Sequence, residues 1–148
     1  MSRTLIKNAT IFDATGAAPF AGDLLVEGNS IAAATPAGSK DHGEADRVID
    51  GTGLFCMPGM TEGHGHISFE GVTATENLIT PTPEEQVFCA ARGAKALLTA
   101  GFTSVYGASE AKLRLAVAVR NEIAAGRLGI PRNRREIAAG TGAWTSRS

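Results

Sequence analysis

The order of predicted elements in residues 58–126 is the feature that most limits how this chain can fold. A strand that includes residues 64–66 is followed by a loop, a helix over residues 82–101 and a strand over residues 102–106. A second helix is expected over residues 110–125. This strand–helix–strand–helix order favours parallel strands joined by right-handed crossovers.

Sequence signals mark both ends of the first helix. Thr82 suits the N-cap and Pro83 the first helical position, while Glu85 stands three residues past the cap, as a capping box requires. Gly101 is the expected C-terminal stop. The face predicted to be buried repeats at helical spacing and comprises Val87, Ala91, Ala94 and Leu98.

The second helix is expected to begin after Ser109, as its N-cap, and to end at Gly126. Two such β/α units cannot close a sheet, since a parallel barrel of this kind needs eight strands and about 250 residues. The buried stripe predicted for this helix comprises Leu113, Ala116, Val117, Val119 and Ile123.

The first 57 residues are expected to form a small β-sandwich portion. Gly28 and Asn29 fit a two-residue loop in a tight hairpin, because they tolerate positive φ angles. His42 lies in a polar loop, and we expect it to be exposed because nothing beside it forms a site. The five predicted strands cover residues 4–12, 23–27, 30–34, 47–50 and 54–57.

Composition limits the class and the location of the protein. The chain is 43% apolar, but no run approaches the roughly 18 apolar residues of a membrane span. The N-terminus enters a strand pattern directly, so we expect a cytoplasmic protein with Cys56 and Cys89 reduced. Residues 127–148 hold five arginines against one acid and are predicted to be a basic, poorly ordered tail. Aromatic support for nucleic-acid binding is limited to Trp144, so neither nucleic acid nor membrane is an expected partner.

Two of the three histidines form one H-x-H pair, His64 and His66. On a strand, side chains two positions apart project from the same face, about 6–7 Å apart along the strand. This spacing can place two imidazoles on one metal ion. No histidine follows His66, and the sequence identifies no further ligand and no catalytic residue.

The segment Pro-Gly-Met-Thr-Glu-Gly-His-Gly-His at residues 58–66 resembles the signature of the amidohydrolase superfamily, in its imidazolonepropionase and prolidase-like branch. The resemblance implies a TIM-type (β/α)8 barrel, of which residues 58–126 would form the first two units and which this chain leaves incomplete. It also implies one or two divalent metal ions, most commonly Zn²⁺, and a metal-activated hydroxide that hydrolyses a C–N bond other than a peptide bond. The resemblance extends to residues 5–13, 22–31, 48–53 and 99–105.

By this resemblance His64 and His66 would bind the metal, and Glu62 would orient the strand without binding it. The loop at residues 68–81 would contribute to the pocket for a small-molecule substrate. One interpretation is that the chain is the N-terminal fragment of such an enzyme, through natural truncation, a frameshift or design. Another is an inactive binding or assembly module, whose metal site is completed by a complementing chain or in a homo-oligomer. In a third, the two histidines are simply polar strand residues.

Overall fold

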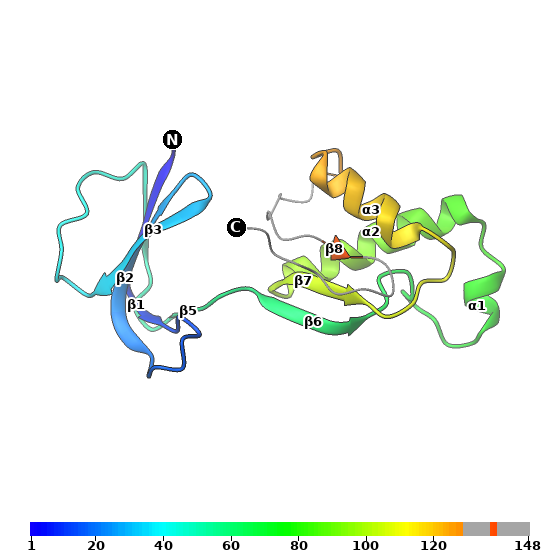
Figure 1. Ribbon diagram of the computed structural model, residues 1–148, viewed down its shortest axis with the longest axis horizontal. Helices are drawn as coiled ribbons and strands as arrows, with labels where there is room; N and C mark the ends of the chain where they lie inside the picture. The colour runs from blue at the N-terminus through cyan, green and yellow to red at the C-terminus, as the bar shows by residue number, and fades with distance from the viewer. Residues whose placement is uncertain (129–136, 139–148) are drawn as a thin grey trace. The chain divides into compact units, whose positions relative to one another are not determined.

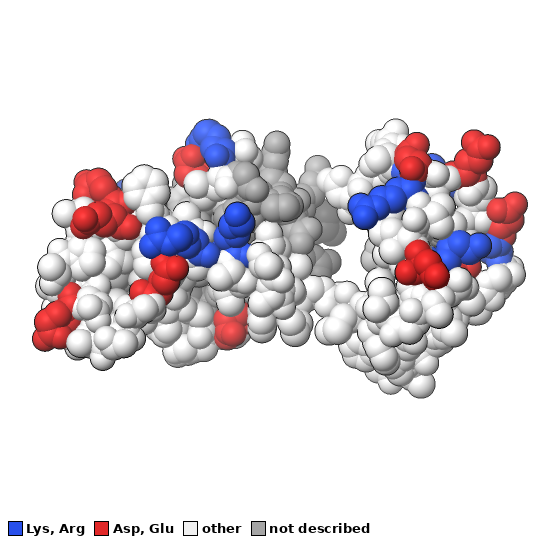
Figure 2. All heavy atoms as spheres, turned by 180° about the vertical axis from the view of Figure 1, so that it is seen from behind, with Lys and Arg blue, Asp and Glu red and all other residues white. Residues whose placement is uncertain are grey.

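The structure, a computed structural model, describes residues 1–128 and 137–138. The chain divides into two compact units, unit 1 at Met1–Pro58 and unit 2 at Gly59–Ser148 (Figure 1). No helix in the described ranges is both long enough and apolar enough to cross a membrane. On the face seen in Figure 2, acidic and basic side chains are interspersed on each unit.

Unit 1 is a single mixed sheet in the order β3-β2-β1-β4, with β5 also paired to β1. The β1–β2 and β2–β3 pairs are antiparallel, whereas β4 and β5 run parallel to β1. The five predicted strands are confirmed, but β4 and β5 join the same sheet instead of forming the second layer of a sandwich. The hairpin turns at Gly28, whose φ is +60°, as predicted. The bounds are β1 Arg3–Ile11, β2 Phe20–Glu27, β3 Ser30–Pro36, β4 Arg47–Asp50 and β5 Phe55–Cys56.

A buried carboxylate ties the loops of unit 1 to its sheet. Asp23 is only 2% exposed, and it accepts the Asn8 N–H at 2.9 Å and the Gly38 N–H at 3.2 Å. The hydrogen bond from Asn8 has the largest effect and lowers the pKa of Asp23, with smaller contributions from Gly38 and the Lys7 charge, whereas burial opposes this shift. Asp23 is therefore an ionised structural anchor at neutral pH.

His42 is buried, with 8% of its surface exposed, so the prediction of an exposed loop histidine is wrong. Its Nε2 lies 3.1 Å from the Thr35 hydroxyl on β3. The Arg3 guanidinium donates to the His42 carbonyl at 2.9 Å and also to the Glu44 carbonyl. Arg3 therefore holds the loop against the sheet. Arg3 and His42 are too far apart in sequence for a local pattern to reveal this contact.

Unit 2 contains a parallel sheet in the order β6-β7-β8, as the predicted element order required. Helices α1 and α2 lie between β6 and β7 in sequence, and α3 lies between β7 and β8. In Figure 1, α2 and α3 cover the same side of the sheet. The short helix α1 falls in a segment predicted to be entirely loop. The bounds are β6 Met60–Gly65, α1 Glu76–Ile79, α2 Pro83–Thr99, β7 Phe102–Gly107, α3 Leu115–Ala124 and β8 Ile137–Ala138.

The strand β8 lies within residues 127–148, the segment predicted to be a basic, poorly ordered tail. Ile137 pairs with Val105 and Ala138 with Tyr106, so a third parallel strand follows α3. Two residues carry too little periodicity to reveal a strand, and the main-chain partner on β7 defines it. The remainder of the predicted tail from residue 129 onward lies outside the described residues.

Helix α2 begins with the predicted capping box. The Thr82 hydroxyl accepts the Glu85 N–H at 3.3 Å, and the Glu85 carboxylate accepts the Thr82 N–H at 2.8 Å. The helix ends at Thr99, and Gly101 follows with a φ of +94°, which confirms the predicted stop. The buried face is rotated from the prediction, because it comprises Gln86, Ala90 and Ala94, while Val87, Ala91 and Leu98 are half-buried.

Helix α3 begins later than predicted, at Leu115, after Arg114 in the left-handed region with a φ of +65°. Ser109 is therefore not its N-cap, because the backbone carbonyl of Ser109 and the carboxylate of Glu110 bond to the chain after β6. Leu113 precedes the helix and is 97% exposed, which contradicts its predicted burial. The buried positions Ala116 and Val119 and the positive φ of Gly126 after the helix agree with prediction.

The core of unit 2 uses small residues to bring its helices close to the sheet. Gly93 on α2 lies directly against the main chain of Ile67, and a Cβ at this position would collide with the Ile67 carbonyl oxygen. A Cβ at Gly65 would likewise collide with the Val105 side chain on β7. These close approaches fix the position of the chain at the end of β6. The core residues are Ile67, Ala90, Ala94, Val105, Ala116 and Val119.

Candidate metal-binding site

The histidine pair lies at the carboxyl end of β6. His64 is in the strand, and His66 follows its last residue, Gly65. Gly65 pairs with Gly107, the last residue of β7, so the carboxyl ends of both strands lie at the same end of the sheet. Parallel α/β folds place their ligand sites at this carboxyl end of the strands.

The structure brings the two imidazoles together on one side of the strand, as the H-x-H spacing predicted. Their ring centroids are 5.1 Å apart, and the ring planes meet at 75°. The other face of His66 stacks on Phe69, with centroids 4.3 Å apart and planes only 12° from parallel. Phe69 thus restricts the rotation of the His66 ring, while His64 is exposed.

A hydrogen bond defines the tautomer of neutral His66. Its Nδ1 lies 2.8 Å from the Ser109 carbonyl oxygen. A carbonyl oxygen can only accept, so Nδ1 must carry the proton and Nε2 must present its lone pair. An imidazole that donates one ring N–H to a backbone carbonyl and offers the other nitrogen is the usual arrangement at protein metal sites.

Glu62 bonds to the main chain of its own strand. Its Oε1 accepts the His64 N–H at 2.9 Å, and within the described ranges no hydrogen bond joins Glu62 to a histidine ring. This contact can orient the backbone that holds His64. The role predicted for Glu62, support without metal binding, stays a prediction.

Glu110 and Ser68 form a polar junction that the sequence analysis did not identify. The Glu110 carboxylate accepts the Ser68 N–H at 3.0 Å and the Ser68 hydroxyl. Ser68 is 1% exposed, so this junction is buried on the Ser68 side. The available signal was the position of Glu110 shortly after a predicted strand, where parallel folds gather functional polar side chains.

The donor set fits half of a zinc site. Zinc commonly takes imidazole nitrogens in a four-coordinate arrangement. His64 and His66 supply two adjacent imidazoles, and the His66 tautomer leaves Nε2 free. Across residues 1–128, no group of three or more His, Cys, Asp or Glu side chains is placed to hold one ion. The histidine pair therefore suits a metal ion that takes its other ligands from elsewhere.

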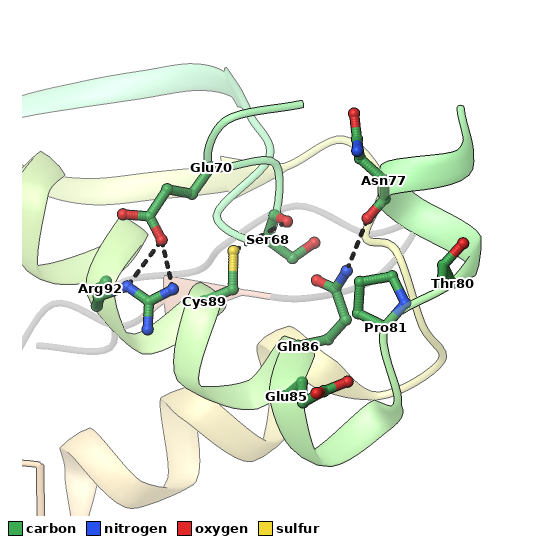
Figure 3. A pocket seen from close by; sticks show the side chains of 9 residues that line it. All are labelled: Ser68, Glu70, Asn77, Thr80, Pro81, Glu85, Gln86, Cys89 and Arg92. Atoms are coloured by element: carbon green, nitrogen blue, oxygen red, sulfur yellow. Dashed lines mark hydrogen bonds and ion pairs between the residues drawn. The ribbon is translucent and has the colours of Figure 1, made fainter. Parts of the chain in front are cut away.

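A separate pocket with a volume of about 450 Å³ lies between the loop after β6 and the helices α1 and α2 (Figure 3). The Arg92 guanidinium, 2.7 Å from Glu70, lowers the pKa of the Glu70 carboxyl. Gln86 donates its amide N–H to the Asn77 carbonyl at 3.3 Å. The loop after β6 therefore lines a cavity, and its role as a substrate pocket stays a prediction. The lining residues are Ser68, Glu70, Asn77, Thr80, Pro81, Glu85, Gln86, Cys89 and Arg92.

Comparison with known proteins gives relatives with named activities. A dihydroorotase from Elusimicrobium minutum is 34% identical over 101 residues, which are 68% of this chain and 20% of that protein. An allantoinase from Salmonella paratyphi B is 40% identical over 78 residues, 53% of this chain and 16% of that protein. The solved structure of molinate hydrolase matches with a TM-score of 0.71 and 19% identity, over 84% of this chain and 27% of that one. No family model matches the chain.

The chain belongs to the amidohydrolase superfamily and corresponds to the N-terminal portion of its members. It spans about a fifth of the length of the dihydroorotase that it matches. The structural similarity to molinate hydrolase concerns the fold alone, since the sequence identity is 19%. The superfamily predicted from residues 58–66 is thereby confirmed, whereas its imidazolonepropionase and prolidase-like branch stays a prediction. The named relatives are hydrolases of this superfamily.

Proposed function

We propose that this chain supplies the N-terminal part of a metal-dependent hydrolase that cleaves a C–N bond in a small amide, urea or lactam-like substrate. The observation that supports this most directly is the pair of adjacent imidazoles at the end of β6, with Nε2 of His66 unprotonated in the neutral ring. Named relatives such as dihydroorotase and allantoinase support the reaction class.

In this proposal His64 and His66 would hold a divalent metal ion, Zn²⁺, through ring nitrogens. A bound metal ion of this kind polarises a substrate carbonyl and lowers the pKa of water so that a nucleophile is available at neutral pH. The Ser109 carbonyl keeps the proton on Nδ1 of His66, and Phe69 restrains the ring. Glu62 steadies the backbone N–H of His64. The loop at residues 68–81 offers a pocket wall to the substrate.

We further propose that β6, β7 and β8 are the first strands of a TIM-type (β/α)8 barrel. Their parallel order and the intervening helices α2 and α3 support this architecture. The remaining ligands and the catalytic acid–base groups would then come from later strands, from a complementing chain or from a homo-oligomer. Free thiols at Cys56 and Cys89 are compatible with the cytoplasmic location that we propose.

Zinc titration of the purified 148-residue chain tests the metal site. Calorimetry is expected to show saturable binding of Zn²⁺ to the unaltered chain. We expect His64→Ala and His66→Ala each to weaken the affinity at least about tenfold, because each removes one of two protein ligands.

The third histidine provides the matched control. His42 is buried, and its Nε2 lies 3.1 Å from the Thr35 hydroxyl, so His42→Gln should leave the zinc affinity unchanged. Equal affinities for the unaltered chain, His64→Ala and His66→Ala would contradict the proposed metal site. A circular dichroism spectrum of each variant verifies that the fold is retained.

A further inference from the structure

The segment after β7, residues 108–111, is hydrogen-bonded to residues 65–68, which comprise the last residue of β6 and the segment that follows it. These contacts involve main-chain and side-chain groups from both segments, so the two loops form one connected unit. The bonds are Ala108 N–H to Gly65 O at 3.0 Å, His66 Nδ1–H to Ser109 O at 2.8 Å, Ile67 N–H to Glu110 Oε1 at 3.3 Å, Ser68 N–H to Glu110 Oε2 at 3.0 Å, Ser68 Oγ–H to Glu110 Oε2, and Ala111 N–H to Ser68 Oγ at 3.0 Å.

The Glu110 side chain makes more of these hydrogen bonds than any other side chain. Its two carboxylate oxygens accept the N–H groups of Ile67 and Ser68, and one of them also accepts the Ser68 hydroxyl. Hydrogen bonds to a carboxylate are roughly twice as strong as bonds between neutral groups. Since Ile67 and Ser68 are both buried, losing these bonds would leave their N–H groups without partners in the interior.

The carbonyl that holds His66 belongs to the residue before Glu110. Ser109 is itself exposed, and among the described residues its side chain makes no hydrogen bond that would fix its position. Its carbonyl is held in place by the hydrogen bonds on either side, from the Ala108 N–H to the Gly65 carbonyl and from the Ser68 N–H to the Glu110 carboxylate. Moving the Glu110 side chain away from Ser68 would release the Ser109 carbonyl from the His66 ring.

The same contacts explain why α3 begins late. A helix starting at Glu110 would carry this side chain away from the end of β6. Instead the chain stays irregular until Arg114, which adopts a φ of +65°, and the helix starts at Leu115. A non-glycine residue in this region of φ is conformationally unfavourable. The segment therefore follows a locally unfavourable path that keeps Glu110 at the junction.

We propose that Glu110 is a positioning residue for the histidine pair: by binding the backbone of Ile67 and Ser68, it fixes the Ser109 carbonyl that holds His66 in its Nδ1–H tautomer. The tautomer leaves Nε2 as the only ring nitrogen with a free lone pair. The part of this inference that concerns metal affinity rests on the proposed function. The part that concerns the tautomer does not, because it describes the metal-free chain.

Nitrogen-15 NMR of the histidine rings tests the tautomer directly. The sample for this test is the metal-free, uniformly labelled 148-residue chain. A pH of 8.5 is chosen because imidazoles in general are neutral there. The unaltered chain is expected to show His66 protonated on Nδ1. In Glu110→Ala we expect a mixture of the two tautomers, with the His64 ring signals unchanged as an internal reference. An unaltered His66 tautomer in a folded Glu110→Ala chain overturns the inference.

Two further variants keep the test informative if Glu110→Ala does not fold. Glu110→Gln retains an oxygen that can accept from Ser68, so it should restore most of the Nδ1–H tautomer. Ser68→Ala removes the hydroxyl that bridges Glu110 and Ala111 and should give an intermediate mixture. The matched control is Glu84→Ala, because this exposed glutamate makes no side-chain hydrogen bond within residues 1–128. Loss of the tautomer in Glu84→Ala, or its full retention in Ser68→Ala, counts against the inference.

Zinc titration of the same proteins separates this inference from the proposed function. Glu110→Ala is expected to bind Zn²⁺ about tenfold more weakly than the unaltered chain, in line with other groups that orient a metal ligand. If the tautomer shifts but no protein binds zinc, Glu110 still positions His66 and the proposed metal site is wrong. If zinc binds and its affinity does not depend on Glu110, the positioning role is wrong while the metal site stands.

Discussion

The two units stabilise their folds by different means. Unit 1 is mainly an antiparallel arrangement of strands that are neighbours in sequence, anchored by the buried Asp23 carboxylate. Unit 2 joins parallel strands through helices and depends on close contact between backbones, as at Gly93 against Ile67. Close glycine contacts also occur in unit 1, at Gly22 and Gly51, but a Cβ at Gly93 would lie nearer to main-chain atoms than at either of them. We therefore expect the second unit to be the more sensitive to the addition of a single carbon atom.

This difference also locates the chemistry. The buried polar groups Asp23 and His42 of unit 1 bond to loops and strands of the same sheet. In unit 2, polar groups meet where strands end, and Nε2 of the neutral His66 ring is the unprotonated nitrogen. Asp23 therefore serves the structure of unit 1, and Nδ1 of His42 is buried without a hydrogen-bond partner among the described residues, whereas the half-buried His66 ring lies where two strands end. Selective variants can show whether this division holds.

The largest expected effect is that of Gly93→Ala. The added Cβ would collide with the Ile67 carbonyl, and overpacking of this kind costs about 3 kcal/mol. This exceeds the gain of about 1 kcal/mol in helix propensity. Amide hydrogen exchange should accelerate throughout unit 2 and remain unchanged in unit 1.

Gly63→Ala is the control for Gly93→Ala, because it makes the same chemical change where no heavy atom lies within 4 Å. It should change the stability of unit 2 by less than about 0.5 kcal/mol. If Gly93→Ala accelerated amide exchange equally in both units, the close contact at Gly93 would not be specific to the stability of unit 2.

The second effect is that of Asp23→Asn, which should destabilise unit 1 by about 2 kcal/mol through weaker bonds to Asn8 and Gly38. The folded-state pKa of Asp23 is lowered, so its contribution is present above the unfolded-state pKa of about 3.9. That contribution is lost as the pH falls through the folded-state value. Exchange of the Asn8 and Gly38 amides, measured from pH 6 to pH 3, should reveal the loss in the unaltered chain.

The Asp23→Asn variant is the control for this pH dependence, because its side chain at residue 23 does not titrate. Its unit 1 stability should vary less over this pH range than that of the unaltered chain. Parallel pH profiles for the two proteins would rule out Asp23 as the anchor of unit 1.

The smallest effect expected is that of Thr82→Ala. This change removes the side chain that caps the Glu85 N–H and should cost about 1 kcal/mol, confined to unit 2. The first turn of α2 should show the fastest exchange. Thr80→Ala serves as control, since no side-chain hydrogen bond of Thr80 is present among the described residues.

Local sequence was sufficient for features whose causes are local. The hairpin at Gly28 and the capping box of Thr82 and Glu85 each depend on residues a few positions apart, and the structure contains both. The H-x-H spacing likewise placed His64 beside His66, because alternation along a strand is a local property.

Features with distant causes could not be predicted in this way. His42 is buried because Arg3 reaches across from β1, and α3 starts late because Glu110 bonds to the chain after β6. The strand β8 is defined by its pairing with β7 rather than by its two residues. In each case a contact between segments far apart in sequence outweighed the local signal.

The parallel pairing of β6 with β7 has a consequence for the order in which the chain folds. Met60 pairs with Phe102, so the strand that bears the histidines leaves the ribosome long before its partner exists. A hairpin such as β2–β3 closes within microseconds, whereas this pairing must close a much longer loop. During synthesis β6 therefore passes through a period with both edges unpaired, when the chain is most open to association with another strand.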